Sequence, residues 1–104
     1  MVVNMLLDTG ATYTAIPRRV AEALGLSINS KRKRRILTAS GSFKLVPWVK
    51  LDRVQVLGQS SEDVEAVIIN LPSCTGLDGL LGGSYLKDYR VLIDYPQGIL
   101  EIRG

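Results

Sequence analysis

One carboxylate in this chain stands where an apolar run meets a glycine turn. Leu6 and Leu7 precede Asp8, and Thr9 and Gly10 follow it. An apolar strand that ends in a glycine turn exposes its last residues, so Asp8 could reach a substrate while backbone N–H groups hold it in place. General acid–base chemistry needs such geometry before it needs a suitable pKa. An Asp-Thr-Gly tripeptide alone is an ordinary turn, so the rest of the chain has to support the assignment.

A second segment repeats this pattern without the carboxylate. Leu80 and Leu81 again lead into a glycine pair, Gly82 and Gly83. The two segments look like copies of one unit, and such internal similarity is informative about the fold. Asp78 is the nearest acidic residue, but it precedes the apolar pair instead of following it, and we interpret it as a turn residue. The chain therefore offers one carboxylate in this context.

Composition excludes several other chemistries. The sequence has no histidine, which rules out a Ser-His-Asp or Cys-His mechanism and any His-ligated metal site. It shows no glycine-rich phosphate-binding motif, so we expect neither a metal nor a cofactor. The single cysteine, Cys74, cannot form an internal disulfide, and we interpret it as a small loop residue. This fits a reducing compartment, and we expect a cytoplasmic location.

The patterns along the chain predict one all-β domain with one or two short helices. Residues 1–7 are typical of a strand, residues 17–24 of a short helix that stops at Gly25, and residues 84–89 of one or two helical turns. Elsewhere short alternating runs predict strands, with a turn or bulge where the alternation slips at residues 52–53. Many short strands favour a β-barrel or folded sheet. No apolar run is long enough to span a membrane.

Three segments, taken in order, resemble those of the retropepsin-like aspartic proteases. Residues 7–11 resemble the catalytic loop, residues 38–43 the flap, and residues 79–82 the apolar-apolar-Gly motif of the second loop. The continuation through residues 91–102 resembles the closing hairpin of the bacterial members. The ordered set is more specific than any one of its motifs.

The resemblance implies a retropepsin-like β-barrel that covers residues 1–104 as a single domain and forms a two-fold homodimer. It makes Asp8 the catalytic residue, Thr9 a brace between two loops, and the Gly10 N–H the support of the carboxylate. It also implies that a mobile flap and the second loop contact an extended peptide substrate. The residues concerned are Ala39, Ser40, Gly41, Ser42, Phe43, Leu81 and Gly82.

Peptide hydrolysis by this route needs two carboxylates that share a proton around one water molecule. Two-fold symmetry supplies the second, because Asp8 then approaches its own copy in the partner. The sequence therefore predicts a homodimeric aspartic endopeptidase that cleaves proteins or peptides.

The alternative is a catalytically inactive retropepsin-fold module for binding or dimerisation. Members of the family usually carry a further strand before the catalytic one, and only seven residues precede Asp8 here. We expect this to leave a sheet edge open or to weaken association.

The basic run at residues 31–35 allows three interpretations. It could bind nucleic acid or act as an import signal, it could steer acidic substrates, or it could be a solvated loop or strand edge. We favour the last, because clustered cations usually form a solvated face. The run also has no interleaved aromatic residues on which bases could stack. We therefore expect no nucleic-acid partner, and we expect the run to be dispensable for the fold and for cleavage of uncharged peptides.

Overall fold

The computed structural model describes residues 1–38 and 40–104 as a mostly β structure with short helices. The strands are β1 (Met5–Leu7), β2 (Thr14–Ile16), β3 (Lys33–Leu37), β4 (Phe43–Val56), β5 (Gln59–Ile68), β6 (Gly79–Leu81), β7 (Arg90–Asp94) and β8 (Ile99–Arg103). The helices are α1 (Arg18–Ala23), a 3-10 turn η1 (Ser73–Thr75) and α2 (Gly83–Leu86). The expected all-β fold with two short helices is confirmed.

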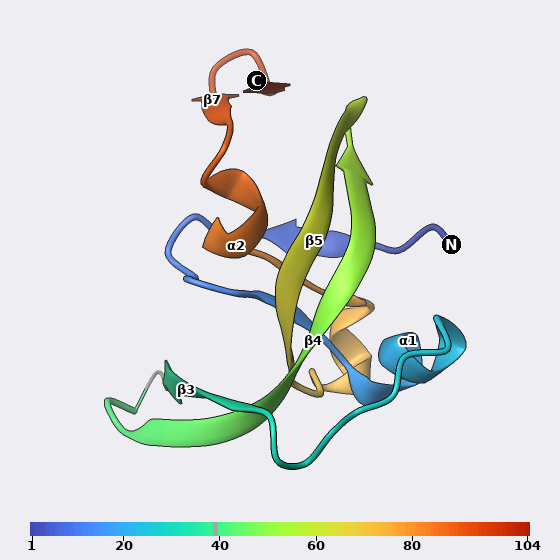
Figure 1. Ribbon diagram of the computed structural model, residues 1–104. Helices are drawn as coiled ribbons and strands as arrows, with labels where there is room; N and C mark the ends of the chain where they lie inside the picture. The colour runs from blue at the N-terminus through green and yellow to red at the C-terminus, as the bar shows by residue number, and fades with distance from the viewer. Residues whose placement is uncertain (39) are drawn as a thin grey trace.

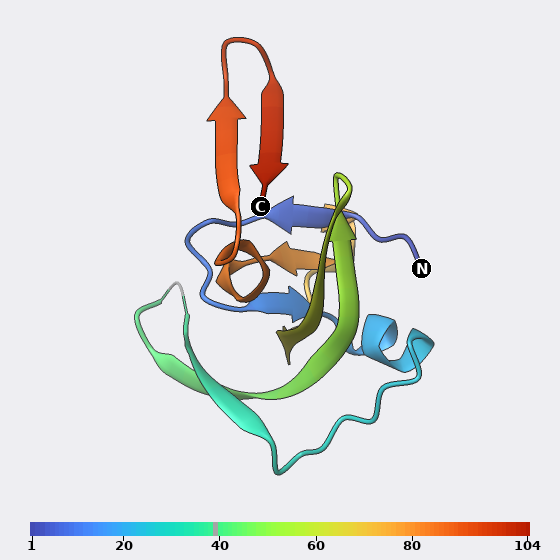
Figure 2. The same cartoon turned by 45° about the horizontal axis from the view of Figure 1, so that its top comes forward.

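Six strands form one curled sheet, in the order β1-β6-β2-β5-β4-β3, and β7 pairs with β8 separately. The sheet bends into a half-barrel because β4 and β5 are long and strongly curved (Figure 1). The β7–β8 hairpin projects away from this body (Figure 2). The hairpin formed by β3 and the first part of β4 extends beyond the end of β5, because β5 stops pairing with β4 at Trp48.

The two similar apolar segments of the sequence lie side by side. β1 and β6 are parallel neighbours, with Leu6 opposite Leu80 and Leu7 opposite Leu81. β6 also pairs with β2 on its other side, where Leu80 lies opposite Ala15. The chain therefore leaves β1 and β6 at the same edge of the sheet, Asp8 from one strand and Gly82 from the other.

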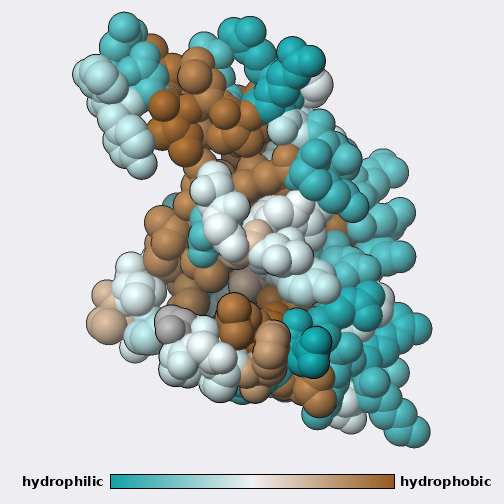
Figure 3. Space-filling view, turned by 90° about the vertical axis from the view of Figure 1, so that its left-hand side faces the viewer, coloured by the Kyte–Doolittle hydropathy of each residue, from teal (hydrophilic) through white to brown (hydrophobic). Residues whose placement is uncertain are grey.

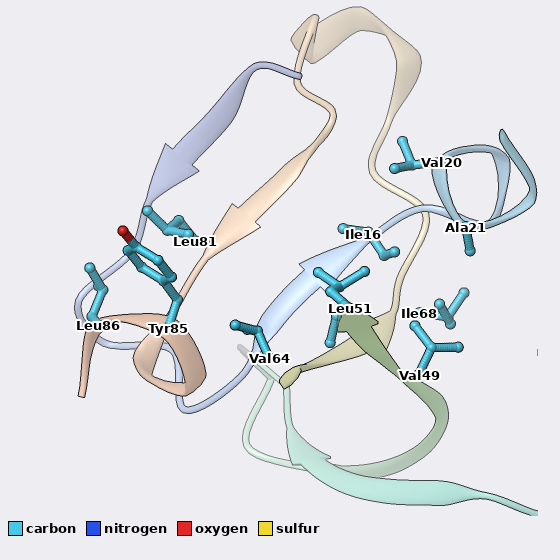
Figure 4. Packing of buried hydrophobic residues seen from close by; sticks show 11 residues of the cluster. Ile16, Val20, Ala21, Val49, Leu51, Val64, Ile68, Leu81, Tyr85 and Leu86 are labelled. Carbon is cyan, nitrogen blue, oxygen red and sulfur yellow. The ribbon is translucent and has the colours of Figure 1, made fainter. Parts of the chain in front are cut away.

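The main hydrophobic core fills the concave side of the sheet and reaches both helices. Its central side chains come from β2, α1, β4, β5, β6 and α2 (Figure 4). Tyr85 is fully buried, and its hydroxyl donates a hydrogen bond of 2.8 Å to the Gln59 carbonyl. Burial raises the pKa of Tyr85 to about 12, so the phenol stays neutral and keeps donating. Burying a side chain of this size contributes roughly 1.5–3 kcal/mol.

A smaller apolar cluster attaches the β3–β4 hairpin to the body. Ile36, Val46 and Trp48 of the hairpin pack with Ala15 and Val67 of the sheet. Val46, Ala15 and Val67 are each at most 3% exposed, so this contact excludes water. The hairpin is thus held at its base by packing as well as by strand pairing.

Local predictions from the sequence are largely confirmed, with two differences at strands. Helix α1 begins after Pro17 and ends before Gly25, whose φ of +74° suits a helix stop. The first strand is limited to Met5–Leu7. The turn or bulge expected at residues 52–53 is absent, because β4 runs through this position and its register with β5 is the same before and after it. The irregularity lies on the opposite strand, where Asp63 has a φ of +54°.

An open groove separates two free sheet edges. Among residues 1–38 and 40–104, β1 pairs with β6 on one side and with no strand on the other, and the second half of β4 pairs with β5 only. Between them lies a groove of about 720 Å³, whose lining includes Met5, Leu7, Val20, Leu51 and Val56. The sheet edge beside β1 is therefore open in the described part of the chain.

A carboxylate fastens the start of this pair of strands. Asp78 accepts hydrogen bonds from the Asn4 backbone N–H at 2.8 Å and from Arg19 at 2.7 Å. The Asp78 N–H donates in turn to the Asn4 carbonyl at 2.7 Å. The Asn4 hydrogen bond, followed by the Arg19 guanidinium, holds the pKa of Asp78 below its usual value. Asp78 thus connects the N-terminal segment to helix α1 through hydrogen bonds and an ion pair.

We predict that Asp78→Asn lowers the melting temperature near neutral pH and that this difference shrinks in acid. A carboxyl group whose pKa is depressed by folding stabilises the folded state above its unfolded-state pKa, and this stabilisation is lost as the pH falls through the folded-state value. The measurement is thermal unfolding of both proteins from neutral pH to below the range where free aspartate titrates. A difference that stays constant with pH would contradict the role given to the Asp78 charge.

Candidate active site

Asp8 is fixed by the backbone around it. Its N–H donates to the Leu81 carbonyl at 2.9 Å, which extends the pairing of the two strands by one residue. Its Oδ1 accepts from the Gly10 N–H at 3.1 Å, and its carbonyl accepts from the Ala11 N–H at 3.2 Å. Asp8 is half-buried, whereas Thr9 and Gly10 are exposed. Within the described part of the chain, no hydrogen bond engages Oδ2, so one oxygen is held and the other can face a substrate.

Two glycines of the second loop hold the chain that follows Asp8 in place through backbone hydrogen bonds. The Gly83 N–H donates to the Ala11 carbonyl at 2.7 Å, and the Gly82 N–H donates to Thr14 Oγ1 at 3.2 Å. A Cβ on Gly82 would lie 2.4 Å from the Tyr13 carbonyl oxygen. Any side chain at position 82 would therefore push the two loops apart. The position that corresponds to Asp8 in the second segment cannot hold a carboxylate in this packing.

Thr14 and Ser84 complete the support, and sequence reasoning missed both. The Thr14 N–H donates to Ser84 Oγ at 2.8 Å, and that hydroxyl donates to the Glu65 carbonyl at 2.7 Å. Thr14 is 1% exposed, so these polar contacts are removed from water. Their partners lie far apart in the sequence, and no local pattern indicates them.

Asp78 lies at the opposite end of the paired strands from Asp8. It bonds to Asn4, four residues before Asp8, and a strand rises about 3.3 Å per residue, so roughly 13 Å of strand separates the two positions. No hydrogen bond or ion pair among residues 1–38 and 40–104 joins Asp8 to a second carboxylate. The interpretation of Asp78 as a turn residue outside the site agrees with this placement. One chain thus supplies one carboxylate to the site.

The residues expected in a flap lie at the tip of the β3–β4 hairpin. Gly41 has a φ of +85°, and its N–H donates to the Thr38 carbonyl at 3.0 Å. Ser40, Ser42 and Phe43 are exposed. Ala39, for which we expect the same substrate contact, lies outside the described residues. In both ribbon views, the tip of this hairpin and the loop after β1 lie on the same side of the molecule (Figures 1 and 2).

Leu81 does not fit the substrate contact expected for it. Its side chain is 4% exposed and belongs to the main core with Ile16 and Tyr85. Side chains alternate along a strand, so it is Leu80 that faces the opposite side, where it packs against the cluster below the hairpin. Leu81 contributes to the site through its carbonyl, which holds the Asp8 N–H. Gly82 is also buried and acts through its backbone.

The basic run is strand β3 and the turn before it, and Arg34 differs from its neighbours. Its guanidinium lies 4.3 Å from the Trp48 ring centre and makes two hydrogen bonds to the Glu65 carboxylate, at 3.1 and 3.2 Å. Lys31, Arg32, Lys33 and Arg35 are exposed. A solvated strand edge therefore describes these four residues, whereas Arg34 is a half-buried contact between the hairpin and β5.

The comparisons with known proteins agree with this geometry. The sequence profile of a family described as aspartyl protease matches residues 2–85. The chain belongs to the aspartyl protease family. It is also similar in structure to a retropepsin-like aspartic protease from Rickettsia conorii, with a TM-score of 0.61 and 26% sequence identity over 92% of this chain and 76% of that one. The search of curated proteins gave no match.

Retropepsin-like aspartic proteases are thus the relatives that the motifs around Asp8 indicated. Among the described residues, no group of three or more acidic or cysteine side chains is placed to hold a metal ion. The helices of the same residues are too short to cross a membrane.

We predict that Gly82→Ala lowers the free energy of unfolding by about 3 kcal/mol or more, because the new methyl group meets the Tyr13 carbonyl in a packed site. Gly98→Ala is the matched control. It adds the same methyl group where no atom lies within 4 Å, so it should cost only the penalty of its left-handed backbone, about 1–2 kcal/mol. Denaturant unfolding of both variants makes the comparison, and equal losses would show that the Gly82 contact does not constrain the two loops.

Proposed function

We propose that this protein is a homodimeric aspartic endopeptidase in which Asp8 of each chain contributes to one active site. The observation that carries the proposal is the Asp8 carboxylate, held by the Gly10 N–H on a loop that rests on Gly82 and Gly83. Membership of the aspartyl protease family supports the reaction type. The single carboxylate per chain supports the dimer, because the chemistry requires two.

In the proposed mechanism the two Asp8 carboxylates share one proton and bind one water molecule. The ionised carboxylate takes a proton from the water as its oxygen attacks the scissile carbonyl carbon. The protonated carboxyl group gives its proton to the carbonyl oxygen, which becomes a hydroxyl as the tetrahedral intermediate forms. The carboxyl group that took the water's proton then passes it to the amine nitrogen as the C–N bond breaks, while a hydroxyl of the intermediate returns its proton to the other carboxylate. The pair again holds one proton. Because only the singly protonated pair works, we expect the best rate at mildly acidic pH.

The projecting hairpin is our candidate for the subunit contact. Large apolar side chains on β7, β8 and the turn between them are exposed, and they are Leu92, Ile93, Tyr95, Ile99 and Leu100. Apolar side chains gather on this hairpin at the top of the space-filling view (Figure 3). An exposed apolar group of this kind on a small protein is typical of an association surface. A second copy of the chain would cover it in a two-fold, self-complementary contact.

The remaining parts of the resemblance complete the proposal. The tip of the β3–β4 hairpin acts as a flap that closes over an extended substrate, excluding water and positioning the peptide. In this proposal Ala39, Ser40, Gly41, Ser42 and Phe43 contact the substrate. Thr9 braces the two Asp8 loops across the symmetry axis. We also propose a cytoplasmic location, which an exposed and unpaired Cys74 fits.

A binding or dimerisation module without peptidase activity is the second candidate. The open groove between β1 and β4 favours it, because a largely apolar groove of this size can hold a binding partner. This candidate requires the same dimer but no turnover, so it is separated from the peptidase by activity and not by assembly.

We predict that Asp8→Asn abolishes peptide cleavage and leaves the fold intact. The amide is nearly isosteric with the carboxylate but cannot take a proton from water, and loss of a general base costs at least about 10²–10⁴-fold in rate. The measurement is turnover of a peptide library by the purified proteins, with circular dichroism to confirm folding. Asp78→Asn is the control and should be much milder. An Asp8→Asn protein with the turnover of the natural one would remove Asp8 from the mechanism.

We predict that specific activity falls on dilution, because each active site needs two chains. Leu92→Arg should move this loss to higher protein concentration, since it places a charge in the proposed subunit contact. Leu57→Arg is the matched control, because Leu57 is similarly exposed (62% against 52%) but lies in the turn between β4 and β5. Activity is measured across a dilution series beside sedimentation analysis. Constant specific activity from a demonstrated monomer would contradict the dimeric site.

A further inference from the structure

The β3–β4 hairpin carries an extreme local charge. Residues 31–50 contain seven of the thirteen cationic residues of the chain and none of its ten acidic residues. The rest of the chain is therefore net acidic. Of the seven cations, Arg34 is the one with a carboxylate within ion-pair distance among the described residues. The other cations keep their charge available to a partner.

The outer face of this hairpin combines charge with exposed apolar side chains. Directly opposed residues of an antiparallel pair share a face, and the register places Arg35 opposite Leu45 and Leu37 opposite Phe43. Lys33 lies on the same face, two residues before Arg35. Leu37, Phe43 and Leu45 are 61–65% exposed.

This outer face is distinct from the face that holds the hairpin in place. Ile36, Val46 and Trp48 point to the other side, where they pack on the sheet. The outer residues are not needed for that packing, so their exposure has no evident structural purpose. Exposed leucine and phenylalanine side chains beside unpaired cations indicate a binding surface.

The free backbone edge of β3 borders the outer face of the hairpin. β3 pairs with β4 on one side and ends the six-stranded sheet, so its other backbone edge has no strand partner among the described residues. An extended peptide that adds to such an edge gains main-chain hydrogen bonds. Its alternate side chains then face the side chains of the host strand. Here they would face Lys33, Arg35 and Leu37.

We propose that the outer face of the β3–β4 hairpin, formed by Lys33, Arg35, Leu37, Phe43 and Leu45, docks an extended segment of the polypeptide substrate in which acidic residues alternate with apolar ones. The docked segment lies outside the residues around the scissile bond. This inference rests on the proposed peptidase function, because the docked polypeptide is taken to be the substrate of that activity. The substrate class it predicts is polypeptides with an acidic, partly apolar segment.

Charge complementarity would also suit nucleic acid or an anionic lipid surface, but the geometry favours a peptide. Trp48 lies on the inner face of the hairpin, where Arg34 stacks on it at 4.3 Å, and Phe43 is the aromatic ring of the outer face, with Arg35 at 4.4 Å from its centre. A single ring that already stacks with an arginine does not form the series of rings on which successive bases stack. A lipid surface offers hydrocarbon to the free backbone edge of β3, and hydrocarbon cannot satisfy its N–H and C=O groups. An extended peptide can pair its carboxylates with the cations, cover the apolar side chains and hydrogen-bond to the free backbone edge of β3 at the same time.

The test is a binding measurement that does not depend on catalysis. Fluorescence anisotropy follows a short labelled peptide of alternating Glu and Leu on the Asp8→Asn protein, beside a peptide in which Gln replaces Glu. The test variants are Lys33→Glu with Arg35→Glu, and separately Leu45→Ser. The control pair is Arg18→Glu with Arg53→Glu, which changes the net charge equally at exposed cations outside the hairpin.

We expect the Glu peptide to bind at least about tenfold more tightly than the Gln peptide and to weaken as salt is added. The charge reversal on β3 should remove this preference, Leu45→Ser should weaken binding of both peptides, and the control pair should change neither. Equal binding of the two peptides, equal loss in the control pair, or tighter binding of oligodeoxythymidine or of phosphatidylserine vesicles would overturn the proposal. If the protein without substitutions binds the Glu peptide on this face but cleaves no peptide, the docking surface is supported and the peptidase assignment is removed.

Discussion

The close backbone contact between the two glycine loops is the constraint on which the rest of the structure depends. β6 lies between β1 and β2, and it enters and leaves this position at glycines. A Cβ on Gly79 would lie 2.2 Å from the Ala15 carbonyl, and one on Gly82 would lie 2.4 Å from that of Tyr13. Only a backbone without side chains allows this approach. The approach in turn brings Asp8 and its supporting hydrogen bonds to one edge of the sheet.

The same constraint explains why one chain carries a single carboxylate at this edge of the sheet. Two similar segments run in parallel, but one ends in Asp8 and the other in a glycine that has no room for a side chain. In the proposed mechanism the second carboxylate therefore comes from another molecule. The chain leaves an apolar hairpin exposed at one end and a strongly cationic hairpin at another. In our proposals these two surfaces serve different tasks, association with a second copy and docking of an acidic chain, so that one small domain keeps assembly and substrate binding apart.

The sequence predicted the features that depend on local patterns. The apolar runs before Asp8 and Gly82, the helix between Pro17 and Gly25 and the turn before β8 could all be recognised within a few residues. Features that join distant residues could not. The bonds from Thr14 to Gly82 and Ser84 and from Arg34 to Glu65 depend on the fold that brings them together. The basic run contains no aromatic residue, yet β4 places Phe43 and Trp48 against its arginines. Leu81 was expected to contact the substrate, but its side chain lies in the core, because side-chain direction follows from strand register.

The distance between the two Asp8 carboxylates in a crystal structure of the assembled protein tests the central claim most directly. Two carboxyl groups that share a proton should approach to about 2.5–3 Å between their nearest oxygens, since a hydrogen bond between a carboxyl group and a carboxylate is short. The account predicts this distance across a two-fold axis, with the Gly10 N–H still donating to Oδ1 in each chain. A dimer whose contact surface leaves the two Asp8 side chains apart, each facing solvent, would contradict the account.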